Sequence, residues 1–149
     1  MTYYLHVENN KIISSGEIPM VEPFISVEVS EEVYNSYMQD KDLYIWDGSA
    51  IVPNPDYEEI KKKERQEYIQ SLTMTRRVFA LGLQQMGITY SQLKALIATN
   101  EQAMLEWDLC EHLNRNNPLL DVMAAQMGIT HEQLDDMFIR ANSEPPDVV

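Results

Sequence analysis

Residues 85–93 are QMGITYSQL and residues 126–134 are QMGITHEQL, so seven of nine positions repeat after 41 residues. In each copy the glycine follows a run of apolar residues at helical spacing, and glycine suits the left-handed position just after a helix. The threonine and the glutamine three residues later form a capping box, which satisfies backbone groups at the start of the next helix. The stretch therefore predicts a helix-Gly-Ile-Thr-helix corner that the chain uses twice.

Residues 72–142, which contain both corners, predict an all-α domain. One of its helices is expected over residues 101–115, EQAMLEWDLCEHLNR. We expect the single cysteine, Cys110, to be a small buried residue of this helix. Further helix starts are expected at Thr73 or Thr75, Thr99-Asn100 and Asn117-Pro118. The expected core residues are Phe79, Leu83, Met86, Leu93, Leu96, Ile97, Leu105, Trp107, Leu109, Leu120, Met123, Met127, Leu134, Met137 and Phe138.

Residues 1–55 predict a small antiparallel β-rich module. Short runs rich in β-branched and aromatic residues are separated by turn residues, among them Asn9-Asn10 and Asp47-Gly48. Ser30 offers an N-cap to a short helix that begins at Glu31. The expected strands are YYLHV (3–7), KIISS (11–15), FISVEVS (24–30), LYIW (43–46) and AIV (50–52).

Residues 56–71, DYEEIKKKERQEYIQS, predict a charged connector helix. Acidic residues precede basic ones at a spacing of four, which is the favourable polarity for ion pairs along a helix. Residues 143–149 predict a flexible tail. The fold class expected from the whole chain is α+β: a β-rich module, a connector helix and an all-α domain.

The formal net charge of −13 is unevenly distributed. Residues 1–55 carry nine acids and two bases (−7), residues 56–100 carry five and seven (+2), and residues 101–149 carry ten and two (−8). An acidic surface repels phosphate backbones and anionic membranes, so neither is expected as a partner. Solubility accounts for such a charge, and the alternative is a partner with a basic face. No signal peptide or membrane span is recognisable, and we expect a cytoplasmic protein.

Residues 119–138, LLDVMAAQMGITHEQLDDMF, resemble the helix-turn-helix of bacterial regulators. Ala124 precedes Gly128 by four positions, as in that motif, and Leu134 and Met137 lie at its usual apolar positions. The helix that would read DNA departs from the family, because it carries three acids and no base before Arg140. A helix entering the major groove needs cations or amides near phosphates and base edges, so direct nucleic-acid binding is disfavoured.

No catalytic, cofactor-binding or metal-binding residues are predicted. The three histidines lie at positions 6, 112 and 131 without metal-ligand spacing, and no phosphate loop or nucleophile motif occurs. The two copies of the repeat differ at Tyr90-Ser91 and His131-Glu132, where the corners can differ in what they touch. The candidate partner-binding residues are Tyr90, His131, Glu132, Asp135 and Asp136.

A second resemblance covers residues 1–57 and extends to about residue 70. Three segments carry it: YYLHVENNKIISSGEI, EVSEEVYNSY and LYIWDGSAIVPNPDYEE, the last leading into the charged helix. This succession is similar to small accessory proteins encoded near the tail genes of tailed phages and prophages. The resemblance implies a non-enzymatic tail component or tail fibre assembly chaperone that binds other phage proteins, in the host cytoplasm or in the virion. The alternative hypothesis is an acidic counter-defence inhibitor that occupies the nucleic-acid-binding surface of a host protein.

Overall fold

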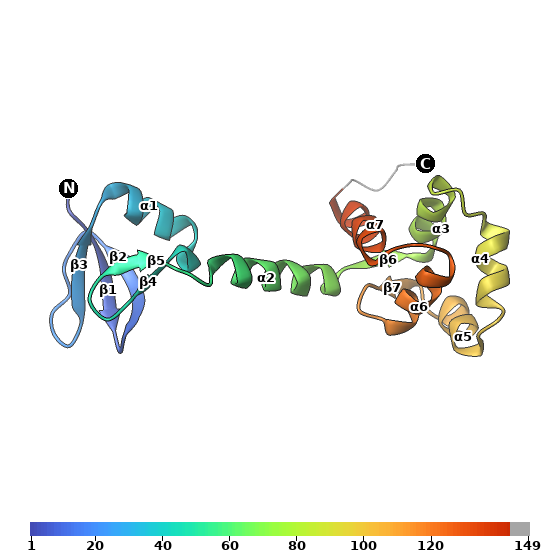
Figure 1. The fold of residues 1–149 in the computed structure, drawn as a ribbon, viewed down its shortest axis with the longest axis horizontal. Coiled ribbons are helices and arrows are strands. Elements are labelled where there is room, and N and C mark those ends of the chain that lie inside the picture. The colour runs from blue at the N-terminus through green and yellow to red at the C-terminus, as the bar shows by residue number, and fades with distance from the viewer. Residues whose placement is uncertain (144–149) are drawn as a thin grey trace. The chain divides into compact units, whose positions relative to one another are not determined.

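The structure is a computed structural model that describes residues 1–143 of the 149-residue chain (Figure 1). The fold is mixed α/β, with a small antiparallel sheet followed by helices. The chain divides into two compact units, the first covering Met1–Lys63 and the second starting at Glu64. Within residues 1–143, none of the helices combines the length and the apolar character that crossing a membrane requires.

The first unit is built on a three-stranded antiparallel sheet. Strands β1 (Tyr3–Glu8), β2 (Lys11–Gly16) and β3 (Ile25–Val29) lie in the order β2-β1-β3. The turn between β1 and β2 uses Asn9 and Asn10, both with positive φ, as their side chains allow. The register between these strands shifts between His6 and Val7. The strands predicted over residues 3–7, 11–15 and 24–30 are confirmed within a residue at each end.

Helix α1 (Glu31–Gln39) packs against β1 on one face of this sheet. It starts at the predicted N-cap, where the Ser30 hydroxyl accepts a hydrogen bond from the Val33 N–H at 3.2 Å. Leu5, Val7 and Tyr37 are buried between helix and sheet. Burial raises the pKa of the Tyr37 hydroxyl. The core of the first unit is therefore small and lies on the α1 side of the sheet.

The predicted second hairpin is formed by β4 (Tyr44–Trp46) and β5 (Ile51–Pro53). Asp47 Oδ1 accepts hydrogen bonds from the backbone N–H groups of Ser49 (2.8 Å) and Ala50 (2.7 Å), which holds the pKa of Asp47 below its usual range. Gly48 has φ +102°, a value that favours glycine.

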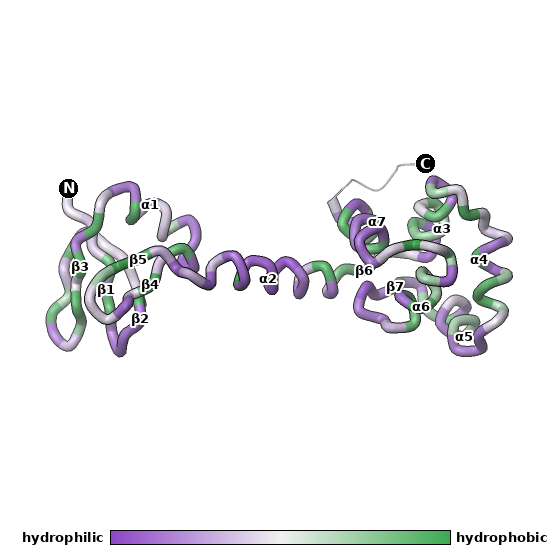
Figure 2. Tube along the Cα trace, viewed as in Figure 1, coloured by the Kyte–Doolittle hydropathy of each residue, from purple (hydrophilic) through white to green (hydrophobic). Residues whose placement is uncertain are grey.

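Helix α2 (Tyr57–Ser71) starts against the short 3-10 helix η1 (Lys41–Leu43). Lys61 Nζ lies 3.0 Å from carboxylate oxygens of both Asp40 and Asp42, and the Tyr57 hydroxyl donates to Asp40. The Asp42 backbone N–H, then Lys61, lower the pKa of Asp40. The middle of α2 is exposed and hydrophilic (Figure 2), whereas Ile69 near its end is buried.

The second unit contains a two-stranded sheet, so the prediction of an all-α domain is wrong. Strand β6 (Thr73–Thr75) pairs antiparallel with β7 (His112–Asn114), and Met74 lies opposite Leu113. Helix α5 (Glu101–Leu109) accordingly ends before Cys110, where the sequence predicted a helix through residue 115. The helical pattern of residues 110–115 is overridden because their backbone groups pair with a strand almost forty residues away.

The remaining helices of the second unit enclose one apolar core. They are α3 (Arg76–Gln85), α4 (Tyr90–Ile97), α6 (Pro118–Gln126) and α7 (His131–Ser143). Most predicted core residues are buried or packed against that core. The buried core residues are Leu72, Met74, Phe79, Leu83, Leu93, Ile97, Ala103, Trp107, Leu120, Met123, Ala124, Ile129, Leu134 and Phe138.

Four predictions about buried residues are wrong. Leu105 and Leu109 are 54% and 78% exposed, because the inward positions of α5 are Ala103 and Trp107. Met86 lies beyond the last residue of α3 and is 38% exposed. Cys110 is exposed because α5 has already ended.

The predicted tail covers residues 143–149, and beyond Ser143 it lies outside the described residues.

The turns after α3 and α6 have the same backbone hydrogen bonds. Ile88 N–H donates to the Leu83 carbonyl at 3.0 Å, and Ile129 N–H donates to the Ala124 carbonyl at 2.9 Å. Each glycine has positive φ (Gly87 +85°, Gly128 +75°) and donates to the carbonyl three residues earlier. This is the Schellman pattern of helix ends.

Both following helices start with the same cap. The Thr89 hydroxyl accepts from the Gln92 N–H, and the Gln92 side chain accepts from the Thr89 N–H, which makes a capping box at α4. Thr130 and Gln133 exchange the same two bonds at α7. At α5 the cap is Asn100, whose side chain accepts from the Ala103 N–H, rather than Thr99.

Candidate functional site

The second turn lies beside a buried ion network. Arg115 is 2% exposed; its Nε lies 2.6 Å from Asp135 Oδ1 and its Nη1 lies 2.9 Å from Asp121 Oδ1. His131 Nδ1 also lies 3.1 Å from Asp121 Oδ1. Two of the five predicted partner-binding residues, His131 and Asp135, are thus connected through residues that the sequence analysis did not single out. Arg115 lies there because it directly follows β7, which pairs with β6. Its backbone N–H donates a hydrogen bond to the Leu72 carbonyl, which extends this pairing.

The other predicted partner-binding residues lie on the surface. Tyr90 is 56% exposed on α4, and Glu132 and Asp136 are exposed on α7. Asp135 differs from them, because its carboxylate is committed to Arg115 and is only 18% exposed. Binding of a partner at these residues stays a prediction.

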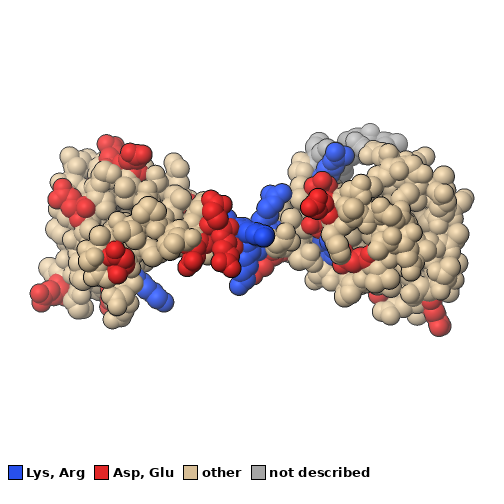
Figure 3. Space-filling view, in the orientation of Figure 1, with Lys and Arg blue, Asp and Glu red and all other residues tan. Residues whose placement is uncertain are grey.

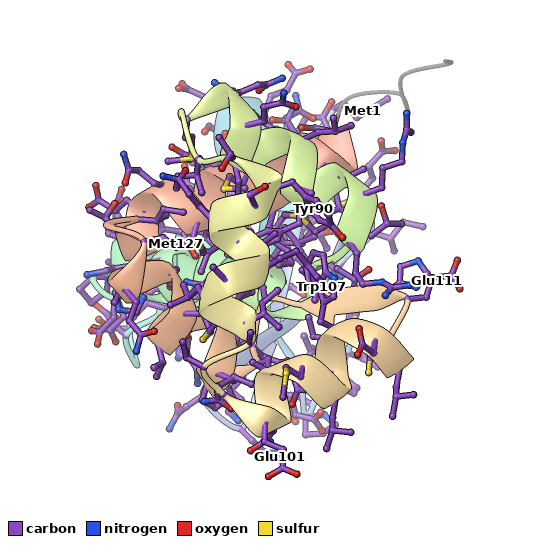
Figure 4. The ribbon with its side chains drawn as sticks, turned by 90° about the vertical axis from the view of Figure 1, so that its right-hand side faces the viewer. Met1, Tyr90, Glu101, Trp107, Glu111 and Met127 are labelled. Carbon is purple, nitrogen blue, oxygen red and sulfur yellow. The ribbon has the colours of Figure 1, made fainter. Side chains whose placement is uncertain are left out.

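A small cavity lies within the core of the second unit. Its volume is about 50 Å³, and apolar side chains of α3 to α6 line most of it, with Glu106 and Asn117 hydrogen-bonded at its edge. Figure 4 shows Trp107 and Met127, two of its lining residues, on either side of α4. Ligand pockets usually enclose roughly 300–1,000 Å³, so this cavity is a packing gap rather than a binding site.

The opposite face of the first sheet is covered by a loop, residues 17–24, that we call the strap. His6 points to this face, is 4% exposed, and makes two hydrogen bonds: Nδ1 with the Ser14 hydroxyl at 2.8 Å and Nε2 with the Ile18 carbonyl at 3.1 Å. Ser26 Oγ accepts from the Met20 N–H at 2.8 Å and lies 3.3 Å from the Met20 carbonyl. The backbone of the strap is therefore fixed to polar groups of the sheet.

Two apolar side chains of the strap, Ile18 and Val21, are largely exposed. Val21 is 82% exposed and Ile18 is 78% exposed, although His6 and Ser26 hold the backbone beside them. Met20 and Ile25 differ from these two: the Met20 sulfur lies 3.9 Å from the Ser14 hydroxyl of the sheet, and Ile25 lies opposite Val7, on the α1 side of the sheet. We call Ile18 and Val21 the strap patch. These exposed side chains are not part of the apolar core of the first unit.

The strap patch lies in an acidic stretch of the chain. Residues 12–40 contain six acids, including Glu17, Glu22 and Glu28, and neither Lys nor Arg. All three of these glutamates are exposed. Among the charged side chains on the visible face of the first unit in Figure 3, acidic ones predominate, whereas both acidic and basic side chains lie along α2.

No role for the strap was predicted from the sequence. The segment EIPMVEPF has no periodicity that separates an exposed apolar loop from a buried one. The available signal was Pro19 and Pro23, which flank the apolar pair Met20-Val21 and exclude a regular strand there.

Metal binding finds no support in residues 1–143, where no three His, Cys, Asp or Glu side chains are grouped to hold an ion. The chain matches no protein-family model, no curated protein and no solved structure.

Proposed function

We propose that the protein is a non-enzymatic phage or prophage protein, a tail component or tail fibre assembly chaperone that binds other phage structural or assembly proteins. The exposed apolar side chains of the strap patch are the observation that supports the binding function. Ile18 and Val21 lie three residues apart on the strap and are 78% and 82% exposed, and exposed apolar surface marks contact sites. A backbone already fixed by hydrogen bonds lowers the entropy lost on binding.

The phage assignment is supported by the resemblance of residues 1–57 to tail-associated accessory proteins. The strap lies within these residues, between the first hairpin and the segment EVSEEVYNSY. A protein of this kind acts in the host cytoplasm during assembly, or remains in the virion as a component. We also propose that the two corners of the second unit are copies of one helix-turn-helix unit, which their identical caps and the 41-residue offset support.

Site-specific photo-crosslinking in phage-producing cells tests the proposed function. A photoreactive residue replaces Val21 in the full chain, and the matched control carries it at Ser49, an exposed residue of the second hairpin. We expect Val21 to crosslink to a phage structural or assembly protein and Ser49 not to do so. Crosslinking to host proteins alone, or to nothing, would contradict the proposal.

An acidic counter-defence inhibitor is the second candidate, favoured by the net charge of −13 and by the acidic stretch 12–40. Such a mimic would lose affinity for a basic host protein steeply with ionic strength, because its contacts replace phosphate contacts. A complex dominated by apolar contacts would depend on salt much less. Crosslinking from Val21 to a nucleic-acid-binding host protein would favour this candidate.

A DNA-binding regulator has less support. In α7, Asp135 is neutralised by Arg115, but Glu132 and Asp136 remain exposed on the helix that would enter the groove. Binding of double-stranded DNA at roughly 50 mM salt, where phosphate contacts are strongest, would support the regulator function instead.

A further inference from the structure

We propose that the strap patch binds a partner polypeptide segment in which apolar residues are flanked by Lys or Arg. This inference rests on the proposed protein-binding function and adds the chemistry of the partner. The patch supplies the apolar surface, and the glutamates around it supply the charge preference.

The strap crosses the sheet as a fixed loop, because His6 holds the Ile18 carbonyl and Ser26 holds both backbone groups of Met20. Gly16 leads into it at a point where an added Cβ would lie 3.3 Å from the His6 ring, so the loop lies close to the sheet. Val21 and Ile18 consequently present their side chains outward in one conformation, which suits a linear segment laid across them.

Glu17 and Glu22 lie within the strap, and Glu28 is exposed on β3, the strand that follows it. Among residues 1–143, neither Glu22 nor Glu28 takes part in an ion pair. Unpaired acids around an apolar patch favour basic partners and penalise acidic ones, through both the association rate and specificity.

Two other occupants of the strap patch would meet electrostatic repulsion. A second copy would bring two acidic stretches without Lys or Arg together, in a chain of net charge −13. An anionic lipid surface would be repelled by the same glutamates. A basic, partly apolar polypeptide meets neither obstacle.

Selection from a random dodecapeptide display library on the immobilised full-length protein tests this inference. We expect enriched peptides to combine apolar residues with Lys or Arg and to be depleted of Asp and Glu. A synthesised representative should bind about tenfold more weakly to the Ile18→Ser/Val21→Ser variant, because the apolar anchors are lost. The Leu109→Ser variant is the matched control, since Leu109 is also 78% exposed but lies on α5, and it should bind the peptide as the wild type does.

Charge reversal separates the acidic rim from the apolar patch. The Glu22→Lys/Glu28→Lys variant should bind the basic peptide several-fold more weakly and should select peptides containing Asp or Glu. Both substitutions are on the surface, and tryptophan fluorescence with far-UV circular dichroism confirms that the variants fold. Enriched peptides without basic residues, or binding unchanged by Ile18→Ser/Val21→Ser, would overturn the inference.

Two further measurements address the excluded occupants. Concentration-dependent dimers in sedimentation that Val21→Ser abolishes would assign the patch to self-association and overturn the inference. Binding to vesicles rich in phosphatidylserine that Val21→Ser abolishes would also overturn it. Failure of the proposed function is distinguishable: basic apolar peptides can be selected even if Val21 crosslinks to no phage protein, and phage proteins can be crosslinked even if the selected peptides are not basic.

Discussion

The turns at residues 85–93 and 126–134 combine one backbone arrangement with two different surroundings. At both turns a glycine with positive φ ends a helix, an isoleucine N–H bonds back to a helix carbonyl, and a Thr-Gln capping box starts the next helix. The carbonyl that receives the isoleucine N–H belongs to Leu83 in the first turn and to Ala124 in the second. Both side chains are buried, so a large residue and a small one occupy equivalent positions.

The ionic surroundings of the turns differ as well. Asp121 and Asp135 of the second turn correspond, at the 41-residue offset, to Ala80 and Lys94 of the first. The residue that pairs with both acids, Arg115, corresponds to Met74. The caps therefore set the path of the chain, and the surrounding side chains decide whether a turn is packed by apolar atoms or by ions. Variants that exchange these side chains test that separation.

The largest expected effect comes from Leu83→Ala. Leu83 is 1% exposed, and its truncation should lower the free energy of unfolding of the second unit by about 3 kcal/mol, through lost transfer energy and the cavity left behind. The reverse change, Ala124→Leu, should cost about 1 kcal/mol, because a hollow lined by Ala124, Ala125 and Gly128 takes up part of the added volume.

Urea unfolding measures both changes in a Trp46→Phe background, where Trp107 is the remaining tryptophan and reports on the second unit. If Leu83→Ala lowered the free energy of unfolding by less than Ala124→Leu, the expected order of these two effects would be wrong.

The next largest effect is expected for Arg115→Met, which introduces the residue of the first turn. Removing one partner of a buried ion pair leaves the others uncompensated, and the cost should be about 2–3 kcal/mol because Asp121 and Asp135 keep some solvent contact.

The triple variant Arg115→Met/Asp121→Ala/Asp135→Lys, which carries the first turn's residues throughout, should recover more than half of that loss, since no buried acid remains unpaired. Equal stability of the single and triple variants would mean that Arg115 acts through packing rather than charge.

Features of the two turns that depend on neighbouring residues could be predicted from the sequence. The glycines, threonines and glutamines act within a few residues of themselves, so the helix ends at Gly87 and Gly128 and the caps at Thr89 and Thr130 follow from local chemistry. The hairpin turn at Asn9-Asn10 and the N-cap at Ser30 were predictable for the same reason.

Features that depend on distant residues were not predictable. The β6–β7 pairing joins Met74 to Leu113, and the same pairing ends α5 early and exposes Cys110. The burial of Arg115 follows from it. The strap was missed because its apolar residues have no period, and their exposure depends on where His6 and Ser26 hold the backbone.

A smaller and equal effect is expected for Gly87→Ala and Gly128→Ala. Nothing lies within 4 Å of the position of an added Cβ at either residue, so the cost is the backbone strain of a left-handed alanine, about 1–2 kcal/mol each. The same urea measurement should give values within about 0.5 kcal/mol of each other. Unequal costs would show that the surroundings, and not the shared backbone, determine these two helix ends.

The smallest effects are expected for the caps. Thr89→Ala and Thr130→Ala should each cost about 1 kcal/mol, because each hydroxyl accepts one N–H at a helix start. Thr99→Ala is the matched control: Thr99 donates to the Leu96 carbonyl while Asn100 caps α5, so its loss should cost less than that of either capping threonine. Serine at positions 89 and 130 should keep most of the stability, since it retains the hydroxyl. If Thr130→Ala were clearly more costly than Thr89→Ala, the cap beside the Arg115 network would be coupled to those ions, and backbone and surroundings would not be separable at the second turn.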